Sequence, residues 1–319
     1  MRLLCLHQFF FCYIILDFFQ GILAAKLLVT GGFPNQAPNE VIDLKNENNL
    51  CDNIGDDLSG KFKYGTVGGL LNDQPVICGG AYIDTNQCYT VKDQGTLLSG
   101  TLHENRMFSA SAVINDFLWI TGGFDGSSLS KTTEMFHLAL GKSIPGPELP
   151  YPVYHHCVAK INDFQAMIIG GFYYLDPPYL YDFQQEAWTI LPNLMQPRGM
   201  AGCATFEEQG QVKVIVSGGT INGQVFSSTE ILDVQSGTWR TGPELPQTLY
   251  KHSMVTQNNQ VYVIGGETKQ GYQSTIYRME CSELLECHWQ ELTQKIQTPR
   301  CQFTAMLVFN QLVKKCEQN

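Results

Sequence analysis

Short apolar runs that end in a double glycine recur along the chain at a nearly constant spacing. The first glycines of the doublets are Gly31, Gly79, Gly122, Gly170, Gly218 and Gly265. Successive doublets are therefore 48, 43, 48, 48 and 47 residues apart. Another apolar run usually precedes each doublet run, and an Asn- or Asp-containing turn separates the two. Because Asn and Asp tolerate left-handed backbone angles, this pattern predicts a two-stranded hairpin in each unit.

Each unit continues with two further predicted strands. The third is an apolar segment such as EVIDL at 40–44, EMFHL at 134–138 or EILDV at 230–234. The fourth is predicted to begin at Trp188, Trp239 and Trp289 in three of the units. One four-stranded sheet cannot bury its own faces, so a repeat of this length predicts sheets packed around a ring, a β-propeller.

The two ends of the repeat array complement each other. The first unit begins directly with its doublet strand, whereas an extra apolar segment, residues 300–313, follows the last unit. We expect this segment to supply the inner strand of the first blade, so that no sheet edge stays open. The prediction is an all-β, six-bladed propeller over residues 26–319, closed by pairing of the C-terminal strand with the first blade.

Residues 1–25 differ from the repeats. Arg2 is followed by aromatic and aliphatic residues, and the stretch ends in Ala24 and Ala25. This order is typical of a secretory signal peptide, so we expect cleavage near Lys26. The alternatives are an uncleaved membrane anchor and an apolar N-terminus without a targeting role. An anchor needs about 20 predominantly apolar residues, and polar residues interrupt this stretch.

Charge and cysteine content narrow the functional classes. The 319-residue chain has a net charge of -10, which argues against nucleic acid as a partner because such surfaces are rich in Lys and Arg. Nine of the eleven cysteines follow the predicted signal peptide. This number favours export to an oxidising compartment, although the chain has no N-glycosylation sequon.

Two cysteine pairs are candidates for disulfides. Cys78 and Cys88 border the loop between adjacent predicted strands of the second blade, and the Cys281–Cys287 pair flanks a short loop of the last blade. Cys157 and Cys203 fall in predicted inner strands, where a buried free thiol is the simpler interpretation. The pairing of Cys51, Cys157, Cys203, Cys301 and Cys316 stays open.

The strands and their junctions resemble the kelch-repeat family, whose unit runs from a hydrophobic double glycine to Tyr-Asp, then Trp, then a Pro-Arg junction. Tyr181-Asp182 and Trp188 follow this order, and Pro197-Arg198 and Pro299-Arg300 match the junction. The resemblance covers residues 26–314. Cys51, Thr96 and Ser143 stand where other units have Trp, so we expect looser outer contacts in those blades.

In kelch proteins, one face of the propeller usually holds the partner. The resemblance places on that face the segments that lead into each blade and the loops that follow each doublet. The candidate residues are Arg106, Asp125, His155, His156, Tyr173, Tyr174, Arg198, Asn222, His252, Gln270, Tyr272 and Arg300.

The sequence-based hypothesis is a secreted, monomeric, non-enzymatic scaffold that binds a protein or a glycan without a cofactor. One alternative is an intracellular kelch interaction module related to ubiquitin-ligase substrate adaptors, although we expect no BTB or BACK domain here. A second is a carbohydrate-active enzyme similar to galactose oxidase or to sialic acid mutarotases. A metal at His155, His156 and Cys157 is disfavoured, because neighbouring strand residues point to opposite faces.

Overall fold

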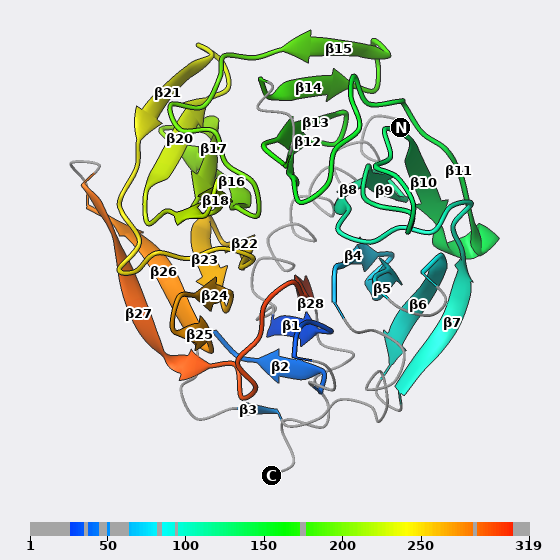
Figure 1. Ribbon diagram of the computed structural model, residues 1–319, viewed down its shortest axis with the longest axis horizontal. Coiled ribbons are helices and arrows are strands. Elements are labelled where there is room, and N and C mark those ends of the chain that lie inside the picture. Colours follow the sequence, from blue (N-terminus) through cyan, green and yellow to red (C-terminus); the bar gives the residue numbers. More distant parts are fainter. Residues whose placement is uncertain are drawn as a thin grey trace, which may run out of the picture.

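The computed structural model describes residues 26–34, 38–44, 50–51, 64–81, 85–92, 95–172, 177–282 and 286–308. Within these ranges the regular structure is almost entirely strand, and the single helix is the 3-10 helix η1 (Leu138–Leu140). The sheets stand around a common centre in a propeller-like arrangement (Figure 1). Across the described part of the chain, no helix has the length and apolar character needed to cross a membrane.

The described strands form sheets of four, eight and two strands. One four-stranded sheet has the order β28 (Thr304–Val308), β1 (Lys26–Thr30), β2 (Glu40–Ile42) and β3 (Leu50–Cys51). The eight-stranded sheet has the order β4 (Thr66–Leu71), β5 (Gln74–Gly79), β6 (Gln87–Lys92), β7 (Gly95–Thr101), β11 (Lys142–Pro145), β10 (Thr133–His137), β9 (Phe117–Thr121) and β8 (Ala110–Ile114).

The remaining strands continue the same order around the ring. The next four-stranded sheet consists of β12 (Cys157–Asn162), β13 (Gln165–Ile169), β14 (Tyr179–Asp182) and β15 (Ala187–Ile190). It is followed by β16 (Gly202–Glu208), β17 (Gln211–Ser217), β20 (Thr229–Asp233) and β21 (Thr238–Thr241). The last consists of β22 (Ser253–Gln257), β23 (Gln260–Ile264), β26 (Thr275–Cys281) and β27 (Cys287–Lys295). Two small hairpins are β18 (Thr220–Ile221) with β19 (Gln224–Val225), and β24 (Glu267–Thr268) with β25 (Gly271–Tyr272).

Several of the predicted hairpin turns are confirmed by their backbone angles. Asn72 and Asp73 join β4 to β5 with φ of 49° and 59°, and Asn258 and Asn259 join β22 to β23 with φ of 50° and 62°. Asn115 adopts φ of 50° between β8 and β9. These turns use the tolerance of Asn and Asp for the left-handed region, which is the signal that the sequence carried.

The C-terminal strand lies beside the first strand of the chain. β28 pairs antiparallel with β1, with Thr304 opposite Thr30 and Val308 opposite Lys26, so red and blue strands are neighbours in Figure 1. The expected closing segment extends to residue 313, and its last five positions lie outside the described residues.

The outer strands β7 and β11 lack a tryptophan, which predicts looser outer contacts, but they remain in contact with each other. β7 and β11 form a parallel bridge between Thr101 and Lys142, and the N–H of Thr101 donates to the carbonyl of Gly141 at 3.2 Å. Gly100 allows this approach, because a Cβ there would lie 2.2 Å from the Gly141 carbonyl oxygen. Elsewhere the tryptophans fasten the outer strands, as where the Trp239 indole N–H donates to the Pro192 carbonyl at 2.9 Å. Direct pairing of two outer strands therefore replaces the tryptophan contact.

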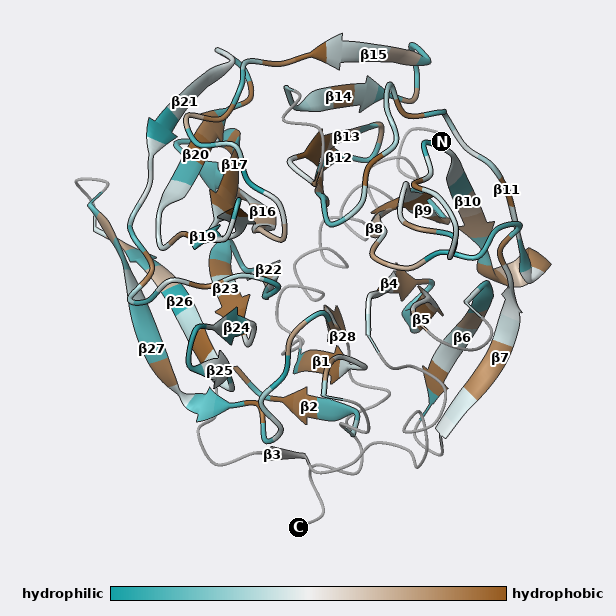
Figure 2. Cartoon of the chain, in the orientation of Figure 1, coloured by the Kyte–Doolittle hydropathy of each residue, from teal (hydrophilic) through white to brown (hydrophobic). Residues whose placement is uncertain are grey.

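The hydrophobic core lies between neighbouring sheets. The second strands are almost completely buried, whereas β21 and β27 on the outside are largely pale or teal in Figure 2. In one cluster, Met167 and Ile169 pack with Val214, Val216 and Leu232 of the next sheet. Since a sheet buries each face only against its neighbour, this packing holds the sheets around the central axis.

Candidate functional site

Six backbone hydrogen bonds form a closed cycle around one end of the central axis. Each donor is the N–H of one residue and each acceptor is the carbonyl of the equivalent residue in the preceding repeat, at 2.8 to 3.0 Å. The members, called ring residues below, are Gly65, Phe108, His155, Met200, Lys251 and Gln302. Every ring residue stands one or two positions before an inner strand, so the cycle marks where the chain enters each repeat.

The ring residues share an unusual backbone conformation. Gly65 has φ of 71°, and Phe108, His155, Met200, Lys251 and Gln302 have φ between 53° and 57°. Glycine adopts this left-handed region freely, but bulky side chains rarely do, at a cost on the order of 1 kcal/mol each. Five of the six positions nevertheless carry large side chains.

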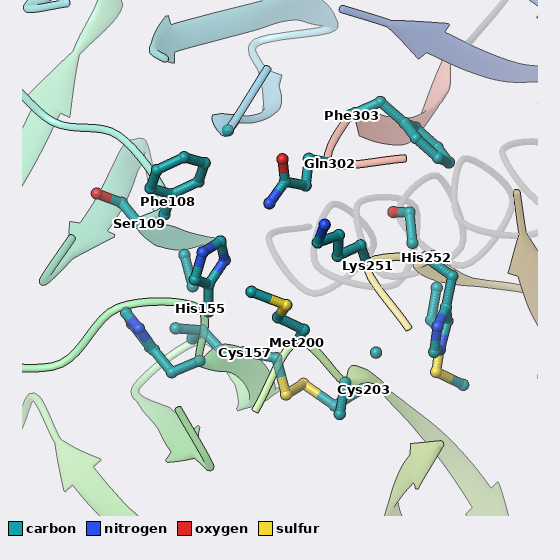
Figure 3. Close-up of a pocket in the computed structure, with 18 of the residues that line it drawn as sticks. Phe108, Ser109, His155, Cys157, Met200, Cys203, Lys251, His252, Gln302 and Phe303 are labelled. Carbon is teal, nitrogen blue, oxygen red and sulfur yellow. A yellow bond between two sulfur atoms is a disulfide. The ribbon is translucent and has the colours of Figure 1, made fainter. Parts of the chain in front are cut away.

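These side chains surround a cavity, which we call the mouth. Its volume is about 210 Å³, and Phe108, His155, Met200, Lys251 and Gln302 project into its open space in Figure 3. Ser109, Phe303 and the disulfide between Cys157 and Cys203 complete much of the wall. The cycle of hydrogen bonds thus fixes a rigid frame, and its side chains give the mouth its chemistry.

Aromatic rings continue outward from the mouth in an arc, which we call the aromatic rim. Centroid distances are 5.5 Å for Phe33 and Tyr272, 5.7 Å for Phe33 and Tyr64, and 5.7 Å for Tyr64 and Phe108. The rim consists of Tyr272, Phe33, Tyr64, Phe108, Tyr154, His155 and Phe172. The described rim side chains are all half-buried, so each keeps part of its surface available for contact.

Lys251 is paired within the protein. Its Nζ lies 2.8 Å from Oε2 of Glu267 and 4.9 Å from the ring centroid of Tyr250. Burial raises the pKa of Glu267, but hydrogen bonds from Lys251 and Tyr250 outweigh it and hold that pKa below its usual value. Cys301 is buried beside the same carboxylate, with Sγ 3.6 Å from Oε2, and burial raises the pKa of its thiol to about 12. This corner therefore holds a compensated ion pair and an unreactive thiol.

The three histidines near the axis are neutral at physiological pH. Burial lowers the pKa of His156 and of His252 to about 3, and their Nε2 atoms lie 2.7 Å from Thr121 Oγ1 and 2.8 Å from Ser217 Oγ. Burial, followed by the charge of Lys251 and the effect of His156, lowers the pKa of His155 to about 3. Among the described residues, no group of three His, Cys, Asp or Glu side chains could hold a metal ion.

The predicted arginines belong to the interior and not to a binding surface. Arg106, Arg198 and Arg300 are at most 1% exposed. Arg198, for example, donates to the carbonyls of Gly218 and Ser228 at 2.8 and 2.9 Å and pairs with Glu230 at 2.6 Å. Arg106 makes the equivalent contacts with Glu134, and Arg300 makes them with Glu40. These side chains tie the double-glycine strand to the third strand, so they serve the fold.

The sequence offered a signal for this interior role. The units with an inward arginine are also the units whose third strand begins with glutamate: EVIDL, EMFHL and EILDV. At the equivalent positions of two other units stand Val153 and Leu249, both fully buried.

The remaining predicted residues are dispersed. His155 and Tyr272 belong to the mouth and the aromatic rim, and His156 and His252 are buried residues that also line the mouth and bond Thr121 and Ser217. Asn222 and Gln270 are exposed at hairpin tips. Asp125 closes a local turn, where N–H groups of Ser128 and Ser127 lower its pKa. Tyr173 and Tyr174 lie outside the described residues.

Sequence reasoning missed most of the ring residues. Phe108, Met200 and Gln302 each stand two positions after an arginine that was singled out, and this fixed offset was the available signal. The backbone cycle that turns them inward depends on all of the repeats together, so no single motif contains it.

Three disulfides join cysteines of the described residues. The predicted pairs Cys78–Cys88 and Cys281–Cys287 are present, each across neighbouring strands, with Cα separations of 4.1 and 4.0 Å. The free-thiol interpretation of Cys157 and Cys203 is wrong, because they form a third bridge with a Cα separation of 6.1 Å. The two residues are 46 positions apart, close to one repeat, so neighbouring inner strands bring them together. Cys301 is a buried free thiol.

Comparison with known proteins points to one repeat family. A family model described as Kelch motif matches residues 213–246. Kelch-like protein 40a of Danio rerio is 29% identical over 36% of this chain and 20% of its own length, and Kelch-like protein 41a of the same species is 30% identical over 42% and 20%. An N-(sulfonatooxy)prop-2-enimidothioate sulfolyase of Thlaspi arvense is 29% identical over 46% of each chain.

The matched segments span only about a fifth of the length of these kelch-like relatives. The segment that the Kelch motif matches contains the Gly218-Gly219 doublet and Trp239, in agreement with the propeller-like arrangement of the sheets. The chain therefore carries a kelch motif at residues 213–246 and is similar to kelch-like proteins over part of its length.

Proposed function

We propose that this chain is a secreted, six-bladed kelch propeller that binds a partner protein at the mouth. The observation that carries the proposal is the set of five large side chains held at positive φ around one cavity. Glycine would satisfy the same backbone geometry at lower cost, so the fold maintains these side chains against a conformational penalty. Strain of this kind clusters at functional sites.

The count of six blades rests on two observations. The eight-stranded sheet divides naturally at the β7–β11 junction, where one residue pair forms the bridge, into two sheets of four strands. The cycle of backbone hydrogen bonds also has one member per repeat and returns to its start through Gly65 and Gln302. Pairing of β28 with β1 then closes the ring between the last and first blades.

The three disulfides support export. Stable disulfides are rare in reducing compartments and common in secreted domains, and Cys157–Cys203 joins inner strands of adjacent blades. The intact mass of protein recovered from the medium of secreting animal cells tests this point. Export predicts a chain that starts near Lys26 and is about two protons lighter for each bridge. Retention inside cells with free thiols would favour the intracellular kelch alternative.

The chemistry of the mouth favours binding over catalysis. The Cys301 thiol is 1% exposed and its pKa is raised to about 12, so it supplies no thiolate nucleophile. Lys251 is held by Glu267, and the neutral imidazoles of His156 and His252 are buried in the wall and bonded to the hydroxyls of Thr121 and Ser217. What the mouth does offer is half-buried aromatic surface, which anchors protein interfaces well.

A matched pair of phenylalanine variants tests the site. Phe108→Asn removes a ring at the mouth, and Asn tolerates the left-handed backbone there. Phe164→Asn removes a ring that is 43% exposed at the hairpin after β12, at the end of that strand remote from the mouth. Disulfide-intact protein and both variants would be used to capture partners from extracellular fluid. We expect Phe108→Asn alone to lose them, and equal retention by both variants would contradict a site at the mouth.

A further inference from the structure

We infer that the mouth selects an uncharged aromatic side chain, a tyrosine or a tryptophan, that a projecting loop of the partner protein inserts. This inference rests on the proposed function, because it names the chemistry recognised at the same site. It follows from the charge balance of the cavity, from its unused hydrogen-bonding groups and from its apolar walls.

The mouth carries almost no uncompensated charge. Lys251 is the only Lys, Arg, Asp or Glu among the described residues that line it, and Glu267 neutralises that charge at 2.8 Å. A carboxylate that captured Lys251 would leave Glu267 without its cation, and an inserted ammonium group would meet Lys251 as a like charge. Burying an ion without a partner is costly. The mouth therefore disfavours acidic and basic side chains alike.

The uncharged polar side chains that face the cavity and remain available include those of Gln302 and His155. The Gln302 amide and the His155 imidazole form no hydrogen bond with another described residue, and both project into the mouth. A neutral imidazole and a primary amide each offer a donor and an acceptor. A tyrosine hydroxyl or an indole N–H can use these groups. A purely aliphatic side chain would displace water from them and leave them unpaired.

The walls match the flat apolar part of such a side chain. The Phe108 ring belongs to the aromatic rim, 4.4 Å from the His155 ring by centroids. Met200 and the Cys157–Cys203 disulfide add polarisable sulfur to the wall near His155 (Figure 3). Aromatic rings gain from edge-to-face contacts with other rings and from contacts with sulfur. Tyrosine and tryptophan each combine an apolar ring with one polar atom. This combination matches the apolar walls and the available polar groups of the mouth.

A library of disulfide-constrained random peptide loops, panned against the disulfide-intact protein, tests the inference. The hydrogen-bond variant is Gln302→Met, because Met200 shows that methionine is accommodated at a ring position with φ of 54°. The matched control is Gln270→Met at the exposed tip of the β24–β25 hairpin. We expect loops with a tip Tyr or Trp to be enriched. Their affinity should fall about tenfold in Gln302→Met and in the Tyr→Phe peptide, and should not change in Gln270→Met.

The other outcomes distinguish a failure of this inference from a failure of the proposed function. Enriched loops with acidic, basic or aliphatic tips that lose binding in Phe108→Asn would overturn the inference and leave the proposed function standing. Loops that bind Phe108→Asn as tightly as the unsubstituted protein would show that the mouth is not the binding site, and both proposals would be wrong. Enrichment of no loop, or competition by a simple methyl glycoside in place of peptides, would also overturn the inference.

Discussion

Replacing Arg198 with methionine should destabilise the protein by several kcal/mol, whereas replacing Arg240 with methionine should have little effect. Both arginines form an ion pair with an N–O distance of 2.6 Å in the same repeat, Arg198 with Glu230 and Arg240 with Glu208. Their burial differs: the Arg198 side chain is fully buried, and that of Arg240 is 45% exposed. The comparison therefore contrasts a buried arginine with a half-exposed one at the same ion-pair distance.

The magnitude follows from what the Arg198 variant leaves behind. Within the described ranges, the Glu230 carboxylate stays buried and keeps hydrogen bonds only from the N–H groups of Met195 and Gln196, at 2.6 and 2.9 Å. The carbonyls of Gly218 and Ser228 also lose the bond from Arg198, although Ser228 still accepts from the N–H of Gly218 at 3.1 Å. Removing one partner of a buried ion pair costs about 3–5 kcal/mol, whereas an exposed pair contributes about 0–1 kcal/mol.

The assay is urea unfolding at pH 7, followed by tryptophan fluorescence with the disulfides intact. Adding Glu230→Gln to Arg198→Met should restore part of the lost free energy of unfolding, because it removes the unpaired charge. A loss below about 1 kcal/mol for Arg198→Met, or equal losses for both arginine variants, would refute the reasoning.

Three further predictions follow from the described structure. The free energy of unfolding should fall by about 2 kcal/mol from pH 6.5 to pH 5 through His252 alone, because its pKa is about 3 in the folded state and about 6.5 in the unfolded state, which therefore binds the proton first. Because His155 and His156 also have folded-state pKa values of about 3, His252→Gln should remove about a third of the combined slope of the three histidines in urea titrations. Serine substitution of the Cys157–Cys203 bridge, with a separation of 46 residues, should lower the free energy of unfolding by about 4 kcal/mol. The same change at the Cys281–Cys287 bridge, with a separation of 6, should lower it by about 2 kcal/mol. Equal losses would argue against loop entropy as the cause. Truncation after Thr298 removes β28 and should lower the unfolding temperature of the whole domain, and a truncated chain that unfolds at the full-length temperature would contradict this.

Local signals explain what could be predicted from the sequence. The Asn-rich turns specify their own backbone angles, and the cysteines that flank hairpins are brought opposite each other by strands that are close in sequence. The similarity of the C-terminal segment to an inner strand likewise anticipated the pairing of β28 with β1. In each case the interaction depends on residues within one motif, or on a segment whose sequence resembles the same strand of another repeat.

Contacts between repeats explain what could not be predicted. Arg106, Arg198 and Arg300 had the right character for a binding surface, and their burial depends on glutamates and carbonyls that only the folded sheets bring together. Cys157 pairs with Cys203 because inner strands of adjacent sheets converge on the axis. The motif of a single repeat therefore suggested a binding role for the arginines, and it gave no indication of the ring residues two positions later.

The closed cycle of hydrogen bonds has an evolutionary consequence. Each ring residue gives its backbone N–H to its neighbour, so the frame is maintained by the main chain whatever side chains it carries. Gly65, Phe108 and Lys251 already occupy equivalent places with unrelated chemistry. Mutation at one of these positions can therefore alter recognition while the scaffold persists, and gene duplication could generate relatives that diverge in their partners by exchanging a handful of residues around an unchanged ring.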